Sequence, residues 1–297
     1  MGLAPTIDEN RYYAGIDVGS ITCDAVLIND SGELLASEVV LTGARSRASA
    51  DAAMAAVLDA AGIRAEQLAS LVSTGYGRDR IEGRSGAVTE ITCHARGALH
   101  LVRETRLLLD VGGQDTKAIA IGPEGRVADF AMNDKCAAGT GRFFEVMARA
   151  LEIDLDDFGA LALSATKRLS LNNVCTVFAE SEAVGMVARG ESAADIAAAI
   201  CRAAAERVVA LGKRVCFTGG ATELPQPITL SGGVARNIGF VRALEEVLGL
   251  PVTVPPDPQV IGALGAALIG ADGDGDGVEA VVSGRWSVKG KGGEGNG

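Results

Sequence analysis

The sequence lacks the features of a membrane, secreted or nucleic-acid-binding protein. Among its 297 residues, no stretch reaches the ~18 uninterrupted apolar residues that a membrane-spanning helix needs. The N-terminus has neither a charged region nor an apolar core, so no secretory signal is predicted. Acidic residues outnumber lysine and arginine, and the net charge of −11 argues against nucleic acids or anionic membranes as partners. We therefore expect a cytoplasmic protein that binds neither nucleic acid nor membrane.

Closely spaced cysteine pairs are absent as well. The six cysteines form no CxxC motif and no dense framework, so we expect reduced thiols rather than disulfides. Free cysteine is among the most buried residue types, and Cys23, Cys93, Cys201 and Cys216 fit that role. Cys201 lies in an Ala-rich predicted helix, and Cys216 in a predicted apolar strand.

Two cysteines stand in polar surroundings instead. Charged residues and glycines flank Cys136, asparagines precede Cys175, and a helix is predicted to begin shortly after each. The N-terminus of a helix stabilises a thiolate, which is the form that binds metals. Cys93 is followed directly by His94, but neighbours in a helix do not face each other, so we expect no nucleophile–base pair there.

The most informative pattern is an internal duplication. The segments "GIDVGSITCDAVLINDSGEL" at 15–34 and "LLDVGGQDTKAIAIGPEGRV" at 108–127 align without a gap, and Asp17 corresponds to Asp110. Each segment predicts a strand, a glycine turn, a second strand, another turn and a third strand. One such turn is common, but two in the same register indicate two related halves.

The chemistry of these turns suits a nucleotide. Glycines let backbone N–H groups approach phosphate oxygens closely. An aspartate at the end of a strand can hold the water shell of Mg²⁺. A third glycine turn, within the predicted strand–turn–helix segment 228–249, presents the amides of a helix N-terminus to a ligand.

Hydrophobic periodicity predicts the remaining elements and the division of the chain. We expect helices at about 49–61, 90–102, 141–151, 176–189, 193–214 and 259–268, and a strand at 68–73. The expected parts are an N-terminal extension at 1–10, a first half at 11–105 plus 258–270, a second half at 106–257, and a disordered Gly-rich tail at 271–297.

Taken together, these features resemble the superfamily of actin, sugar kinases and heat-shock ATPases. That resemblance implies an α/β, duplicated ribonuclease-H-like fold whose two halves clamp ATP and Mg²⁺ in a cleft. Four further motifs are more specific, namely "TGYGR" at 74–78, "DVGGQDTK" at 110–117, "NDKCAAGTGRF" at 133–143 and "CTVFAESE" at 175–182. In these motifs, the chain is similar to one group within the superfamily, the reductive activators of 2-hydroxyacyl-CoA dehydratases and the related ATPase subunits of benzoyl-CoA reductases.

The family resemblance implies an ATPase coupled to electron transfer. Its members hold a [4Fe-4S] cluster at the interface of a homodimer, and the motifs assign Cys136 and Cys175 as the ligands. Ferredoxin or flavodoxin would supply the electron, and an iron–sulfur acyl-CoA dehydratase or reductase would accept it. A [4Fe-4S] cluster normally needs four thiolates, so two cysteines from each of two chains agree with this assignment.

The same resemblance and the glycine turns predict the ATP site. Asp17 and Asp110 are expected to position Mg²⁺ and the attacking water, with Gln114 near the γ-phosphate. The residues expected to surround ATP or ADP are Gly19, Ser20, Ile21, Thr22, Cys23, Asp24, Gly112, Gly113, Asp115, Thr140, Gly232, Gly233 and Gln259. The family commonly has a basic residue where this chain has Asp24, so no cationic phosphate contact is expected there.

Two other functions fit the superfamily. A small-molecule kinase would use a catalytic aspartate opposite the γ-phosphate, and Asp115 is available for that role. A chaperone-like or filament-forming ATPase would need no such base. Both alternatives leave the cysteine motifs without a purpose, so the reductive activator is the preferred prediction and the kinase is the alternative.

Overall fold

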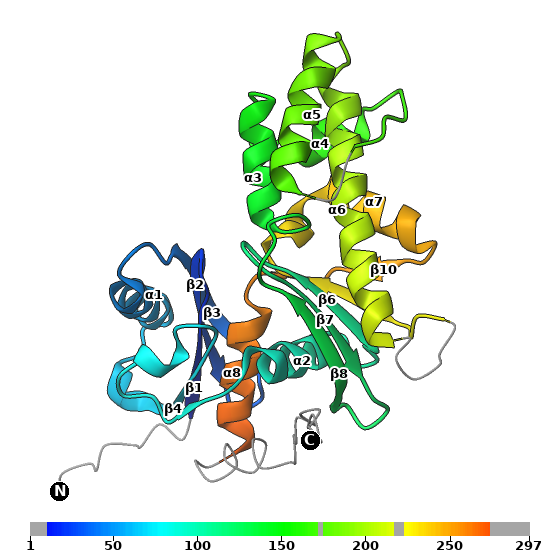
Figure 1. Cartoon of the computed structure of the whole chain (residues 1–297). Coiled ribbons are helices and arrows are strands. Elements are labelled where there is room, and N and C mark those ends of the chain that lie inside the picture. The colour runs from blue at the N-terminus through cyan, green and yellow to red at the C-terminus, as the bar shows by residue number, and fades with distance from the viewer. Residues whose placement is uncertain (1–10, 172–174, 217–222, 274–297) are drawn as a thin grey trace, which may run out of the picture.

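The computed structural model describes residues 11–171, 175–216 and 223–273. Two five-stranded sheets form the framework, and helices pack on both (Figure 1). The predicted N-terminal extension and most of the predicted tail lie outside the described residues. In the described part of the chain, no helix is long and apolar enough to cross a membrane.

The first sheet carries the first half of the duplication. Its strands are β1 (Tyr12–Val18), β2 (Thr22–Asn29), β3 (Leu34–Leu41), β4 (Leu68–Thr74) and β5 (Gly86–Ala87), in the order β3-β2-β1-β4-β5. The first three strands pair antiparallel, whereas β4 and β5 continue the sheet in parallel. Its helices are α1 (Ser46–Ala61), α2 (Glu90–Leu101) and α8 (Ile261–Asp272), with short turns η1 (Ala65–Gln67) and η2 (Arg78–Arg80).

The second sheet repeats this arrangement. Its strands are β6 (Leu107–Val111), β7 (Thr116–Ile121), β8 (Val127–Asn133), β9 (Ile228–Ser231) and β10 (Val252–Thr253), in the order β10-β9-β6-β7-β8. Again the first three strands pair antiparallel and the last two are parallel. The two sheets therefore share strand order and direction, which confirms the duplication.

The second half carries more helices than the first. They are α3 (Gly141–Ala150), α4 (Phe158–Leu163), α5 (Thr176–Ala188), α6 (Ala193–Cys216) and α7 (Ile238–Leu248), with the short turn η4 (Gly233–Arg236) before α7. The ring of Phe144 on α3 makes edge-to-face contacts with Phe158 and Phe240, so the helices share one core with the sheet. In Figure 1, α3, α4 and α5 project beyond one end of this sheet.

Two helices join the halves. Helix α8 packs on β1, β2 and β4, whereas α2 contacts β6, β7 and β8 as well as α8 (Figure 1). Their backbones meet closely, because a Cβ at Gly265 would lie 1.7 Å from the carbonyl oxygen of Cys93, and one at Gly97 would lie 2.2 Å from that of Ile261. Small residues at this crossing therefore set how far α2 reaches toward the second sheet.

Most predicted elements are found within a few residues of their expected bounds, but two expectations need correction and one helix was not predicted. Cys216 ends helix α6 and lies in no strand, because the Ala-rich helical pattern continues through it. Helix α8 continues past the expected end of the first half, to Asp272, whose carboxylate accepts hydrogen bonds from Arg96 of α2 at 2.8 and 3.1 Å. The short helix α4 was not predicted, since six residues are too few to show a helical period.

Candidate functional site

A cavity of about 620 Å³ opens where the two duplicated hairpins meet. It is lined by the β1–β2 turn, the β6–β7 turn, the glycine turn after β9, and side chains of α2. The predicted nucleotide residues that line it are Asp17, Gly19, Ser20, Ile21, Thr22, Asp24, Asp110, Gly112, Gly113, Asp115, Gly232, Gly233 and Gln259. Segments from three parts of the sequence thus converge on one site.

Three predicted residues lie elsewhere. Cys23 is fully buried among Ile16, Val18 and the helix α1, because side chains alternate along β2 and only its neighbours on either side face the cavity. Thr140 is also buried, and its hydroxyl donates to the carbonyl of Ala137 at 2.7 Å. Gln114 is exposed and is not among the residues that line the cavity. Its role near a γ-phosphate therefore stays a prediction.

Asp17 lines the cavity, and two neighbouring glycines leave space for its carboxylate. A Cβ at Gly75 would lie 2.3 Å from its Oδ1, and a Cβ at Gly262 would lie 2.2 Å from its Oδ2. Gly75 also has a φ of +82°, which favours glycine. The "TGYGR" segment thus shapes the pocket for this carboxylate. Burial raises the pKa of Asp17, although His94 and Lys117 act against the rise.

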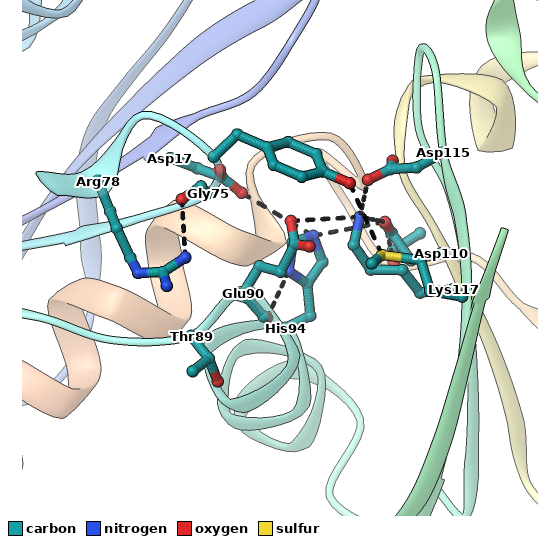
Figure 2. A network of polar contacts seen from close by, with 12 residues as sticks. Asp17, Gly75, Arg78, Thr89, Glu90, His94, Asp110, Asp115 and Lys117 are labelled. Atoms are coloured by element: carbon teal, nitrogen blue, oxygen red, sulfur yellow. Dashed lines mark hydrogen bonds and ion pairs between the residues drawn. The ribbon is translucent and has the colours of Figure 1, made fainter. Parts of the chain in front are cut away.

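Asp110 holds the corresponding place in the second half, and its carboxylate contacts one hydroxyl and two nitrogen groups of the described residues. Its Oδ1 accepts a hydrogen bond from the Ser231 hydroxyl at 2.8 Å. Its Oδ2 lies 3.3 Å from Nζ of Lys117 and 3.5 Å from Nε2 of His94 (Figure 2). Burial alone would raise the pKa of Asp110, but His94 and Lys117 more than offset it and lower the pKa. Asp110 is thus kept as a carboxylate.

Lys117 is the buried cation of the site. Besides Asp110, its Nζ contacts the carboxylates of Asp115 at 3.0 Å and Glu90 at 3.6 Å (Figure 2). Burial acts to lower the pKa of Lys117, but Asp110, Asp115 and Glu90 outweigh it and raise the pKa. A buried ammonium is tolerated only with such partners.

His94 connects the two halves. Its Nδ1 lies 2.8 Å from the carbonyl oxygen of Glu90, one turn earlier on α2. Its Nε2 faces Asp110 and also Asp17, at 4.0 Å. Burial lowers the pKa of His94, but Asp110 and the other carboxylates raise it above the ordinary value. One imidazole thus lies between the aspartates of both duplicated hairpins.

Asp24 differs from Asp17, Glu90, Asp110 and Asp115 in having no cationic partner among the described residues. Its Oδ2 accepts from the Thr22 hydroxyl at 3.5 Å, and its buried Oδ1 has no hydrogen-bond partner in the described part of the chain. It stands directly across the hairpin from Asp17. Burial, with a further contribution from Asp17, raises the pKa of Asp24 to about 8.

The glycine turns fit a phosphate chain. A Cβ at Gly232, where φ is +87°, would lie 2.3 Å from the carbonyl oxygen of Val111. A Cβ at Gly113 would lie 2.6 Å from the side chain of Ile21 in the opposite hairpin. Only glycine fits these close approaches, and their backbone N–H groups suit phosphate oxygens. The carboxylates of Asp17, Asp110 and Asp115 are the hard oxygen ligands that Mg²⁺ takes.

The two cysteines predicted to bind the cluster lie before helices α3 and α5, outside this cavity. Cys175 is the N-cap residue of α5, and Cys136 lies in the loop between β8 and α3. Both thiols are partly buried, and Nη2 of Arg207 lies 3.8 Å from Sγ of Cys136. Within the described residues, no group of three or more metal-binding side chains forms in one chain. Two thiols per chain fit a [4Fe-4S] cluster only when a second chain supplies the rest.

Hydrogen bonds connect the Cys136 segment to the cavity. The amide of Gly141 donates to the carbonyl of Gly112 at 2.8 Å, and that of Arg142 donates to the carbonyl of Gly113 at 2.8 Å. The Thr116 hydroxyl donates to the carbonyl of Gly139 at 2.6 Å. The first turn of α3 is therefore attached to the β6–β7 turn that lines the cavity.

Sequence reasoning did not assign to the site the three residues that surround the inner aspartates, namely Glu90, His94 and Lys117. Two signals were present. Glu90 and His94 are four residues apart and so share one face of a helix. Lys117 lies two residues after Asp115, and residues at that spacing in a strand share a face. Neither spacing indicates that α2 contacts the second sheet, which is what brings these residues together.

Comparisons with known proteins support the family resemblance found in the sequence. A model of the BadF/BadG/BcrA/BcrD ATPase family matches residues 14–270. The activator of lactoyl-CoA dehydratase from Anaerotignum propionicum is 42% identical over 257 residues, covering 86% of this chain and 96% of the relative. A benzoyl-CoA reductase subunit from Thauera aromatica is 33% identical over 267 residues, covering 87% of this chain and 92% of the relative. The family match spans both hairpins as well as Cys136 and Cys175.

Solved structures match the fold. The activator of the 2-hydroxyisocaproyl-CoA dehydratase from Clostridium difficile, with bound ADPNP, superposes with a TM-score of 0.82 at 36% identity, covering 91% of this chain and 96% of that one. A ROK family glucokinase from Streptomyces griseus superposes with a TM-score of 0.55 at 13% identity, covering 88% of this chain and 100% of that one. The second match concerns the fold alone. The expected α/β two-half fold of the sugar-kinase type is confirmed.

Proposed function

The chain belongs to the BadF/BadG/BcrA/BcrD ATPase family, as its sequence motifs led us to expect, and we propose that it couples ATP hydrolysis to the delivery of a low-potential electron. The acceptor we propose is an iron–sulfur acyl-CoA dehydratase or reductase. One observation supports this proposal most strongly. The β6–β7 turn, which lines the cavity, is hydrogen-bonded to the start of α3, only a few residues after Cys136. A nucleotide site and a candidate metal ligand are thereby joined within one short segment.

The proposed ATP site uses both hairpins. Asp17 and Asp110 would hold Mg²⁺ and its waters, and the glycine turns would receive the phosphates. Gly232, Gly233 and Gln259 line the part of the cavity that we assign to the nucleoside. The relative solved with ADPNP supports a triphosphate as the ligand.

The proposed metal centre is a [4Fe-4S] cluster held by Cys136 and Cys175 of two identical chains. When bound, such a cluster accepts and releases one electron at a potential that neighbouring dipoles and hydrogen bonds adjust. Cys175 is the N-cap residue of α5, where the helix dipole favours thiolate, and Cys136 lies in the loop before α3, which packs against α5.

A homodimer is supported by the surface of α5. This helix begins at Cys175, yet it exposes large apolar side chains, among them Val177 and Phe178 at 64% and Val184 at 50%. Exposed apolar patches of this kind mark interaction sites. A twofold contact along α5 would cover these residues and bring the cysteines of both chains together.

The choice of acceptor follows the relatives. Those compared above are named as a lactoyl-CoA dehydratase activator, a 2-hydroxyisocaproyl-CoA dehydratase activator and a benzoyl-CoA reductase subunit. We place the present chain with the dehydratase activators, because it is 42% identical to one and 33% identical to the reductase subunit. Ferredoxin or flavodoxin is the proposed electron donor. The kinase alternative has less support, since Asp115 is paired with Lys117 at 3.0 Å and is not free to act as a base.

Anaerobic purification followed by iron and sulfide counts tests the proposal. We expect four iron atoms per dimer, an absorption shoulder in the visible range, and hydrolysis of ATP that depends on Mg²⁺. Cys136→Ser and Cys175→Ser should each lose the iron, whereas Cys216→Ser, a partly buried cysteine at the end of α6, should retain it. Full iron content in both ligand variants would contradict the cluster assignment.

A further inference from the structure

The cavity is lined by more carboxylate groups than cationic groups. The inner carboxylates are those of Asp17, Asp24, Glu90, Asp110 and Asp115, and the nitrogen groups facing them are those of Lys117 and His94. Farther out, Arg236 lines the cavity, but so do Glu145 and Asp156. A nucleoside triphosphate adds further negative charge, which a single Mg²⁺ neutralises only in part.

Asp24 is the inner carboxylate that lacks a cationic partner among the described residues. Lys117 and His94 are engaged by Asp110, Asp115, Glu90 and Asp17, whereas the ion pairs of the described residues include none to Asp24. The residue is only 7% exposed and still lines the cavity. Its Oδ1 has no hydrogen-bond partner in the described part of the chain. A buried carboxylate oxygen without a partner is costly, so a ligand that satisfies it is favoured.

The geometry supplies a second carboxylate for such a ligand. Asp17 and Asp24 are directly paired across the antiparallel β1–β2 hairpin, and directly opposed side chains lie on the same face of a sheet. Two ionised carboxylates in this position repel each other, and a cation between them would remove that repulsion. The Thr22 hydroxyl, which contacts Asp24, is a further oxygen on the same face.

We propose that Asp24, Asp17 and the Thr22 hydroxyl bind a second divalent cation, distinct from the Mg²⁺ between Asp17 and Asp110, when a nucleoside triphosphate is present. The phosphate chain completes its coordination. Carboxylate, hydroxyl and phosphate oxygens are the ligands that Mg²⁺ and Mn²⁺ prefer. The bound ion brings to Asp24 the positive charge that no ion pair of the described residues supplies there.

This inference rests on the nucleotide site of the proposed function, and Mn²⁺ serves as the probe for it. Free Mn²⁺ is counted by electron paramagnetic resonance as it is titrated into the whole protein with a non-hydrolysable ATP analogue. Binding of a fluorescent triphosphate is measured separately. We expect two Mn²⁺ per bound nucleotide in the wild-type chain, with a spectrum broadened by coupling between neighbouring ions.

Two substitutions at one position make the test specific. Asp24→Asn should bind one Mn²⁺ per nucleotide, and its affinity for the triphosphate should fall by ~10-fold or more, as for loss of a charge-assisted contact. Asp24→Lys should also bind one Mn²⁺, but its triphosphate affinity should return toward that of the wild type. Asp51→Asn, an exposed carboxylate of α1, is the matched control and should keep both ions.

The outcomes separate this inference from the proposed function. One Mn²⁺ per nucleotide in the wild-type chain, or two in Asp24→Asn, overturns the second cation while leaving the ATP site intact. A wild-type chain that binds no triphosphate overturns the ATPase proposal and this inference with it. Two ions in the wild type and one in both Asp24 variants establish the site.

Discussion

Nζ of Lys117 lies 3.3 Å from Oδ2 of Asp110, with both side chains almost fully buried. This ion pair joins the two strands of the second hairpin, and His94 approaches the same carboxylate oxygen from α2. Losing one partner of a buried pair leaves an uncompensated charge, so the cluster keeps Asp110 ionised and fixed in direction. An ionised carboxylate at a fixed position is what an ordered Mg²⁺ site requires.

The first prediction concerns that carboxylate. Asp110→Asn should reduce ATP hydrolysis by ~10²-fold or more, the usual scale for loss of a positioned catalytic group. The amide keeps the shape of the side chain but cannot act as an anionic ligand. Phosphate release at saturating Mg²⁺ and ATP measures the effect, with Asp51→Asn as an exposed control. A nearly unchanged rate in Asp110→Asn would remove the residue from the catalytic site.

The second prediction is a pH dependence of stability that arises from Asp24. Burial and Asp17 raise the pKa of Asp24 to about 8 in the folded chain, while an aspartate in an unfolded chain titrates near ~3.9. Between these values the folded state keeps a proton that the unfolded state has lost. The contribution of Asp24 to the free energy of unfolding therefore falls as the pH rises from ~4 to about 8.

Urea unfolding of the metal-free, nucleotide-free protein checks this sign. Across that pH window, the free energy of unfolding of Asp24→Asn should decline less than that of the wild type. The control Asp51→Asn should follow the wild-type curve, because its carboxylate is solvent-exposed. Parallel curves for Asp24→Asn and the wild type would show that the folded chain does not hold a proton at this site.

The third prediction tests the apolar surface of α5. Val177 and Val184 are seven residues apart and share a helix face, and Phe178 stands beside them at 64% exposure. If this surface forms the homodimer, Phe178→Asp should weaken the dimer by about 2 kcal/mol or more, roughly 30-fold in dissociation constant. Light scattering after size exclusion measures the mass, and iron analysis should show the cluster lost with the dimer.

A matched exposed residue provides the control. Leu41 on β3 of the other half is 76% exposed, and Leu41→Asp should leave both the mass and the iron content unchanged. A Phe178→Asp protein that stays dimeric with full iron would place the interface elsewhere.

Much of the fold followed from the sequence because the duplication repeats one hairpin in one register. Once Asp17 and Asp110 are aligned, the sheet order of one half implies that of the other, and the glycine turns fall at the same end of both sheets. Cys23 is buried, as its residue type led us to expect, but its additional placement beside the nucleotide failed for a local reason. It was grouped with its neighbours in a loop, whereas β2 begins at Thr22 and the alternation of a strand turns Cys23 into the core.

The ion-pair cluster could not be predicted for a different reason. Lys117, Glu90 and His94 meet only because α2 reaches the second sheet, and that distance depends on the close crossing of α2 and α8. The glycines that permit the crossing, Gly97 and Gly265, are far apart in sequence. Propensity and periodicity describe each helix alone, so they carry no information about such a contact.

The last prediction concerns how the nucleotide site and the cysteine segment communicate. We expect closure of the cavity on ATP to move the β6–β7 turn, and the hydrogen bonds between that turn and α3 to transmit the movement to the segment that carries Cys136. The Thr116 hydroxyl, bonded to the carbonyl of Gly139 at 2.6 Å, is the one side-chain contact we select for testing, since it lies outside the catalytic groups. By linkage, a nucleotide that alters the metal centre must bind the oxidised and reduced proteins with different affinities.

Thr116→Val removes this hydroxyl and keeps the shape of the side chain. It leaves the carbonyl of Gly139 without its donor, so we expect a loss of ~1–3 kcal/mol in the free energy of unfolding, while hydrolysis stays close to wild type. The ratio of ADP affinities between the oxidised and reduced proteins, measured by calorimetry under anaerobic conditions, should fall toward one.

Thr105→Val is the matched control. The buried hydroxyl of Thr105 forms a hydrogen bond with that of Thr229 at 2.8 Å. Thr105 lies just before β6 begins, at the end of the sheet away from the cavity. That variant should lose similar stability yet keep the wild-type affinity ratio. An unchanged ratio in Thr116→Val would mean that the coupling does not pass through this contact.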